Sequence, residues 1–206
     1  MQAGSHGSLP RGEVITSPRR LAGVEFYHVS WSRRFTVGQI MRAADFQLRP
    51  HYELFREPPE SQFLSIPRFL PDRRLEAEFE RVRLRVAPHA PSRRTCLFAF
   101  VCKECAQWFR SSAPDRNNGQ IIRTAIDSGG SAFVSDLVWR NVAANVLLRD
   151  FWRSTDFPFP TADQDSALAS VAQAYWQGDD PTVCGLETRP EVLIQGNLMV
   201  LEILPD

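Results

Sequence analysis

The sequence lacks a long hydrophobic run. No stretch approaches the ~18 consecutive apolar residues that a membrane-spanning helix requires, and the opening residues, MQAGSHGSLPRGEV, contain no apolar core like that of a signal peptide. We therefore expect a cytoplasmic protein without a membrane partner.

Net charge is also absent, because 24 basic residues balance 24 acidic ones. No overall field therefore indicates a nucleic-acid or membrane partner. The distribution is uneven: residues 1–94 contain 16 arginines and 10 acidic residues, whereas residues 95–206 contain 8 basic and 14 acidic residues. Two solvated faces would explain this difference, and the arginine-rich half is equally suited to phosphate groups.

Cysteine is scarce, with four in the chain, and a disulfide scaffold is not expected in a cytoplasmic protein of this size. Cys102-Lys-Glu-Cys105 has the CxxC spacing of zinc or thiol redox sites. A structural zinc needs four ligands, and the sequence has no second CxxC and no HxxxH. We predict no metal site and interpret Cys105 as a buried helical thiol. A zinc or thiol redox protein is the third and weakest alternative.

The common nucleotide and hydrolase motifs are missing as well: the sequence contains no GxGxxG, P-loop, GxSxG or HExxH pattern. A length of 206 residues and a hydrophobic content of 43% fit one domain with a single core. Residues 1–22 are rich in Gly, Ser, Pro and Arg, so we expect them to lack order. Residues 23–206 are expected to form the domain.

Periodicity and turn residues predict an α+β fold. Residues 36–41 are expected to form a turn and a short extended or helical piece, and the proline-rich segment 50–71 a loop. Ser128-Gly129-Gly130 is expected to close a strand, and Gln195-Gly196-Asn197 to turn a hairpin. The predicted strands are 24–30, 95–101, 120–127, 191–194 and 198–203, and the predicted helices are 72–86, 103–111, 135–153 (capped by Ser135) and 163–177 (ended by Gly178).

Four segments carry a family resemblance. They are residues 26–30 (FYHVS) with 37–40 (VGQI), 97–100 (LFAF) with the helix containing Ala106 and Trp108, 121–127 (IIRTAID), and 190–196 (PEVLIQG). In order and character they resemble the ADP-ribosyltransferase superfamily, and the last resembles its DarT-type DNA-modifying branch. Tyr175-Trp176-x-Gly178 and Pro91-Ser92-Arg93 also resemble an uncharacterised bacterial family of the same fold.

The resemblance implies a split mixed or antiparallel sheet flanked by helices, and NAD as co-substrate. It implies that Glu191 is catalytic, that His28 and Ser30 hold the adenosine-side ribose, and that Phe98 and Phe100 pack against nicotinamide. Arg93 and Arg94, at a strand entrance, are either solvated turn residues or the groups that meet the NAD pyrophosphate.

The sequence departs from the family pattern at two positions. Phe98 stands where many relatives have tyrosine, which keeps the stacking surface and loses a hydroxyl. Arg189 stands two residues before Glu191, where arginine-modifying members have an acidic residue, so protein arginine is a poor acceptor candidate. Without the resemblance, His28 would be an ordinary hydrogen-bonded side chain, Glu191 a surface residue and both phenylalanines core residues. Glu202 competes with Glu191, but strand alternation can point it to solvent.

The chemistry fits these residue types. Breaking the bond between nicotinamide and ribose develops positive charge on the sugar, which a carboxylate exposed to a cleft stabilises. We therefore expect a mono-ADP-ribosyltransferase, of the toxin or phage-defence type, with a cognate antitoxin or immunity partner. A nucleic-acid acceptor is favoured over a protein one. The alternative is a non-catalytic module of the same fold that binds a nucleotide or a protein.

Overall fold

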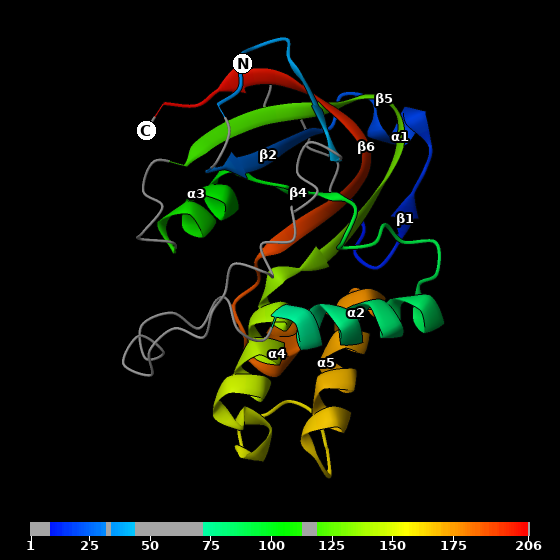
Figure 1. Ribbon diagram of the computed structural model, residues 1–206, viewed down its shortest axis with the longest axis vertical. Helices are drawn as coiled ribbons and strands as arrows, with labels where there is room; N and C mark the ends of the chain where they lie inside the picture. Colours follow the sequence, from blue (N-terminus) through cyan, green and yellow to red (C-terminus); the bar gives the residue numbers. More distant parts are fainter. Residues whose placement is uncertain (1–8, 32–33, 44–71, 113–118, 206) are drawn as a thin grey trace.

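An antiparallel sheet and a group of three helices occupy opposite ends of the molecule (Figure 1). The computed structural model describes residues 9–31, 34–43, 72–112 and 119–205. The predicted α+β class is confirmed. The predicted loop 50–71 lies outside the described residues. The strands are β1 (Val14–Ile15), β2 (Glu25–Ser30), β3 (Ile40–Arg42), β4 (Leu97–Phe100), β5 (Gln120–Asp136) and β6 (Pro190–Ile203), in the order β1-β5-β2-β4-β6-β3.

Strands β5 and β6 are long enough to serve both halves of the sheet. The first half of β5 pairs with β2 and with the end of β6, whereas its second half pairs with the start of β6. The start of β6 also pairs with β4. In the described residues, β2 and β4 are joined by one register pair, Tyr27 with Phe100. The six strands therefore form one antiparallel sheet, in which β2 and β4 pair over a short stretch and β5 and β6 pair over a long one.

The two predicted glycine turns are wrong, because both strands continue through them. Gly130 and Gly196 are register partners, with φ of 135° and 136°, values that side-chain-bearing residues rarely adopt. A Cβ on Gly130 would lie 2.5 Å from the carbonyl oxygen of Gln195. The glycines bend the paired strands where they meet, and the chain does not reverse.

The helix bounds predicted from periodicity and capping residues agree closely with those of the structure. The α helices are α1 (Pro18–Leu21), α2 (Asp72–Val86), α3 (Lys103–Ser111), α4 (Leu137–Arg149) and α5 (Gln164–Gln177), with short 3-10 helices η5 (Phe151–Arg153) and η6 (Pro181–Cys184). Helix α5 ends at Gly178, as predicted, and Asp163, the first residue of the predicted helix, is its N-cap. The prediction for α4 is corrected: Ser135 belongs to β5, Asp136 caps the helix, and Asp150 ends it in the left-handed conformation.

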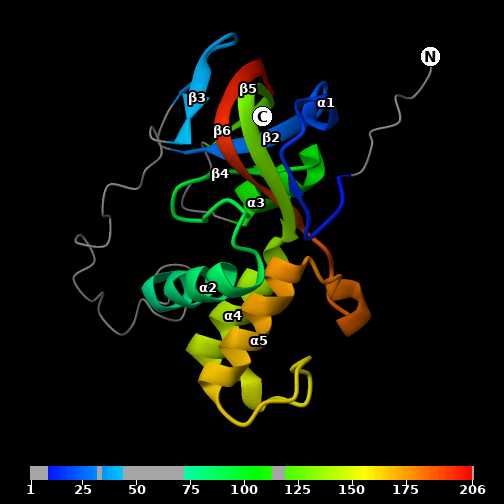
Figure 2. The ribbon, with the colours of Figure 1, turned by 90° about the vertical axis from the view of Figure 1, so that its right-hand side faces the viewer.

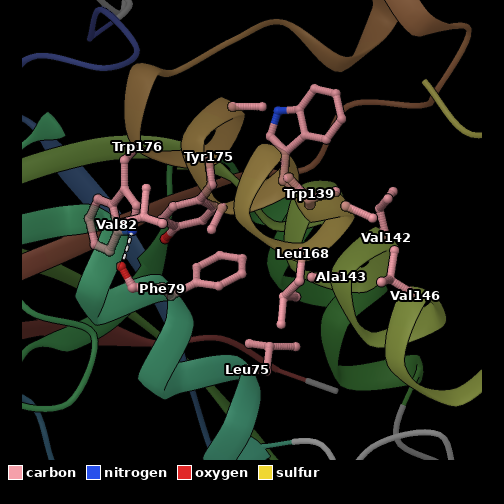
Figure 3. Packing of buried hydrophobic residues seen from close by; sticks show 14 of the residues in the cluster. Leu75, Phe79, Val82, Trp139, Val142, Ala143, Val146, Leu168, Tyr175 and Trp176 are labelled. Carbon is pink, nitrogen blue, oxygen red and sulfur yellow. Dashed lines mark hydrogen bonds between the residues drawn. The ribbon is translucent and has the colours of Figure 1, made fainter. Parts of the chain in front are cut away.

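Helices α2, α4 and α5 pack against one another below the sheet (Figure 2). They share a cluster of buried hydrophobic residues that reaches the sheet at Phe133 and Leu193. Trp176 lies within it and donates from Nε1 to the carbonyl oxygen of Phe79 at 2.7 Å (Figure 3). Since each large buried side chain contributes about 1.5–3 kcal/mol, this cluster fixes the helices relative to the sheet.

Within the segment 1–22, which was expected to lack order, the described residues 9–22 pack against the sheet. Strand β1 pairs with β5, and the amide of Gly12 donates to the carbonyl oxygen of Val134 at 2.9 Å. Ile15 and Leu21 are buried in the sheet's second apolar cluster. Burial of these two side chains explains why a polar segment docks. Among the described helices, none is both long and apolar enough to cross a membrane.

Candidate functional site

Five of the six predicted site residues come from three neighbouring strands, and the sixth, Arg93, precedes β4. His28 and Ser30 lie on β2, Phe98 and Phe100 on β4, and Glu191 on β6. Phe100 is the direct register partner of both Tyr27 and Glu191, so these three side chains project from one face of the sheet. His28 follows Tyr27 in the strand, so it and Ser30 project from the other face.

Glu191 is buried rather than exposed to a cleft as the sequence suggested. It is 2% exposed, at the start of β6 between Ser135 and Phe100. Its Oε1 atom accepts hydrogen bonds from Arg93 Nη1 at 2.5 Å and from the hydroxyl of Tyr175 at 2.7 Å. Among the described residues, none donates a hydrogen bond to Oε2. One carboxylate oxygen is thus anchored twice, whereas the other is not.

Arg93 lies at the centre of a charged network between the sheet and the helices. It is 7% exposed, and its Nε atom lies 3.2 Å from Glu76 of α2. Arg140 of α4 also contacts Glu76, at 3.4 Å. Burial alone would lower the pKa of Arg93, but the carboxylates of Glu191 and Glu76 outweigh it and raise that pKa well above its usual value. Two arginines and two glutamates therefore balance each other within the core.

Aromatic rings surround the Arg93 guanidinium. Its carbon lies 4.8 Å from the centre of the Phe98 ring and 5.0 Å from that of Tyr175. Such cation–π contacts hold the planar group in one orientation. Phe98 therefore packs against the residue that holds Glu191, whereas Phe100 lies in the separate apolar cluster beneath α3.

Tyr175 and Glu76 belong to this site and were not predicted as site residues. Burial and the neighbouring Glu191 carboxylate raise the pKa of Tyr175 well above its usual value, against the opposing effect of Arg93, so its hydroxyl stays protonated and donates. Burial would raise the pKa of Glu76, but Arg93 and Arg140 lower it overall. Tyr175 shares the buried face of α5 with Val171, and a hydroxyl there needs a partner. That requirement is the signal that could have identified it.

His28 joins the site through β4. Its Nδ1 atom lies 2.7 Å from the carbonyl oxygen of Phe98. Burial lowers the pKa of His28 despite this hydrogen bond, so the ring is neutral near pH 7 and Nδ1–H donates. Ser30 is 3% exposed and lies two residues further along. A chain of contacts therefore runs from His28 through Phe98 and Arg93 to Glu191, although His28 and Glu191 project from opposite faces.

A hollow of about 570 Å³ lies elsewhere. It is lined by the end of α2, the start of β1 and the end of α5, and includes His89, Trp176 and Asp179. None of the six predicted site residues lines it. Within the described ranges, no group of three or more His, Cys, Asp or Glu side chains is arranged to hold a metal ion.

Residues 71–206 match the family model described as Protein of unknown function (DUF2441). The chain belongs to this family. The DUF2441 match runs from α2 to β6, so it includes the whole network of Arg93, Glu191, Tyr175 and Glu76, whereas His28 precedes it. No curated protein matches the chain. The network is therefore part of the region that defines the family.

Proposed function

We propose that the protein is an NAD-dependent mono-ADP-ribosyltransferase in which Glu191 is the catalytic carboxylate. One observation carries the proposal: Glu191 is anchored through one oxygen by Arg93 and Tyr175, which leaves Oε2 to meet a substrate. A carboxylate held in this way is preorganised, so it need not reorient when charge develops in the transition state. The antiparallel sheet and its flanking helices are also compatible with the fold that the resemblance implies.

The proposed reaction breaks the bond between nicotinamide and the ribose C1′ atom. Nicotinamide leaves with the bonding electrons, and the Glu191 carboxylate stabilises the positive charge that develops on the ribose. The acceptor then forms a bond to C1′ and gives up its proton, for which Glu191 is the base. We propose that Phe98 and Phe100, which project from the same face as Glu191, pack against nicotinamide, whereas the expected contact of His28 and Ser30 with NAD is left out of the proposal because both project from the opposite face.

The contacts of Arg93 indicate a role other than the expected contact with the NAD pyrophosphate. Its guanidinium already pairs with Glu191 and Glu76, so a contact with the pyrophosphate of NAD would require giving up those bonds. Within the proposal, Arg93 acts through Glu191 as a positioning residue. The acceptor that we propose is a nucleic acid, because the arginine-rich first half of the chain can pair with phosphates.

The test is release of nicotinamide from NAD by the purified protein, with and without DNA, RNA or cell lysate. Glu191→Gln should lower release at least ~100-fold, by analogy with loss of other transition-state charge partners. Glu202→Gln is the matched control: it makes the same change on the same strand, in a partly exposed ion pair with Arg123. Both variants are first shown to fold by urea denaturation. Full turnover by Glu191→Gln would refute the mechanism.

Burial of Glu191 favours a second candidate, a non-catalytic module of the same fold. At 2% exposure, Glu191 in its pair with Arg93 also suits a purely structural tie between sheet and helices. Calorimetry with NAD separates the two functions. Binding of NAD without nicotinamide release under any condition would support the module, whereas release that depends on Glu191 would support the enzyme.

A further inference from the structure

Two thiols meet at the start of α3, apart from the network around Glu191. The Sγ atoms of Cys102 and Cys105 lie 2.8 Å apart. The backbone amide of Cys105 also donates to Cys102 Sγ at 3.3 Å, so Cys102 is the N-cap of the helix. Closing this pair to a disulfide of ~2.05 Å requires the two sulfurs to approach by less than ~1 Å.

The two sulfurs have different surroundings. Burial raises the pKa of Cys105 to about 12, and its contact with Cys102 acts in the same direction. Cys102 instead accepts the backbone N–H of Cys105 at the N-terminus of the helix. Both residues are half-buried, so reagents can reach them. No third His, Cys, Asp or Glu joins them into a metal-binding group in the described part of the chain.

We propose that Cys102 and Cys105 form a dithiol–disulfide exchange site whose substrate is an external disulfide. Cys102 attacks as the thiolate: a bond forms between its sulfur and one sulfur of the external disulfide, whose own bond breaks. The departing thiolate takes up a proton. Cys105 then loses its proton and attacks the Cys102 sulfur, which displaces the second external thiol. The two cysteines are oxidised by two electrons, and the external disulfide is reduced to two thiols.

The probe is oxidised glutathione, added to the full chain, followed by alkylation of the remaining thiols and mass spectrometry. Alkylated thiols should fall from four to two with no glutathione retained, and peptide mapping should link Cys102 to Cys105. Cys105→Ser should retain one glutathione on Cys102, because the resolving thiol is gone. Cys102→Ser keeps a capping oxygen at the helix start and should neither retain glutathione nor form the disulfide.

Cys184→Ser is the matched control, and its thiol count should fall by the same two. The proposal is overturned if the unmodified chain keeps all four thiols, if it retains glutathione, or if Cys105→Ser traps no adduct. A disulfide between chains in place of the internal one would also overturn it. This test does not involve NAD, so its outcome is separate from that of the proposed function.

Discussion

Replacing Arg93 with methionine should destabilise the protein strongly. Methionine keeps most of the apolar volume and can pack against Phe98, but it leaves Glu191 without its cation. Glu76 retains Arg140 at 3.4 Å and is therefore less affected. The main cost is thus one buried carboxylate whose counterion has been removed.

Breaking a buried ion pair by removing one partner typically costs ~3–5 kcal/mol, a large part of the ~5–15 kcal/mol that stabilises a domain. Removing both charges should cost less. In Arg93→Met/Glu191→Gln no uncompensated charge stays buried, and Tyr175 can still donate to the glutamine oxygen. We expect the double variant to be at least ~2 kcal/mol more stable than the sum of the single changes predicts.

Urea denaturation followed by circular dichroism measures these differences, and the single change should lower the midpoint by roughly 1–2 M. Arg123→Met is the matched control, because Arg123 also lies between two glutamates but its side chain is 32% exposed. It should cost less than ~1 kcal/mol. The reasoning is refuted if Arg93→Met costs no more than Arg123→Met, or if the two changes at Arg93 and Glu191 are additive.

Two further predictions concern a crowded glycine and a buried histidine. Gly178→Ala and Gly185→Ala both place a side chain at positive φ, 73° and 71°, but the new Cβ at Gly178 would lie 2.2 Å from the amide nitrogen of Gly12, whereas Gly185 is open. Both substitutions should lower the free energy of unfolding by ~1–2 kcal/mol because of the positive φ, and Gly178→Ala should lower it by roughly 1–3 kcal/mol more because of the close contact. Equal urea midpoints for the two variants would contradict this prediction. Burial lowers the pKa of His28 in the folded protein. Below pH ~6.5 the unfolded chain therefore binds a proton that the folded protein does not bind. The free energy of unfolding then falls by at most ~1.4 kcal/mol per pH unit until the pH reaches the pKa of the folded state. His28→Gln should reduce the difference between the thermal midpoints measured at pH 7.5 and at pH 5.5, and an unchanged difference would contradict this account.

Local patterns in the sequence predicted those elements whose signals are themselves local. Helix α2 has its predicted bounds because Leu75, Phe79 and Val82 repeat at helical spacing and all become buried. The end of α5 at Gly178 likewise depends on the φ of one residue. These features need no information about distant parts of the chain.

The bent strands could not be predicted in the same way. A glycine pair such as Gly129-Gly130 indicates positive φ, but the same φ serves a turn and a kink in a continuous strand. Only the pairing of Gly130 with Gly196, 66 residues away in the sequence, distinguishes the two. Tyr175 and Glu76 were missed for a related reason, since their polar groups meet partners brought by other elements. The resemblance did identify Arg93, Phe98 and Glu191, which the structure joins, while their role in NAD chemistry stays a prediction.

The pairing of β6 with several strands constrains the order in which the protein can fold. This strand follows every other described element, yet it pairs with β3, β4 and β5. During synthesis, the edges of β3, β4 and β5 that pair with β6 stay unpaired until β6 has been made, whereas α2, α4 and α5 can already associate. Such late, long-range pairing slows folding and leaves partly folded intermediates that are prone to aggregate. We therefore expect the ribosome-bound chain to need protection by chaperones until β6 has emerged.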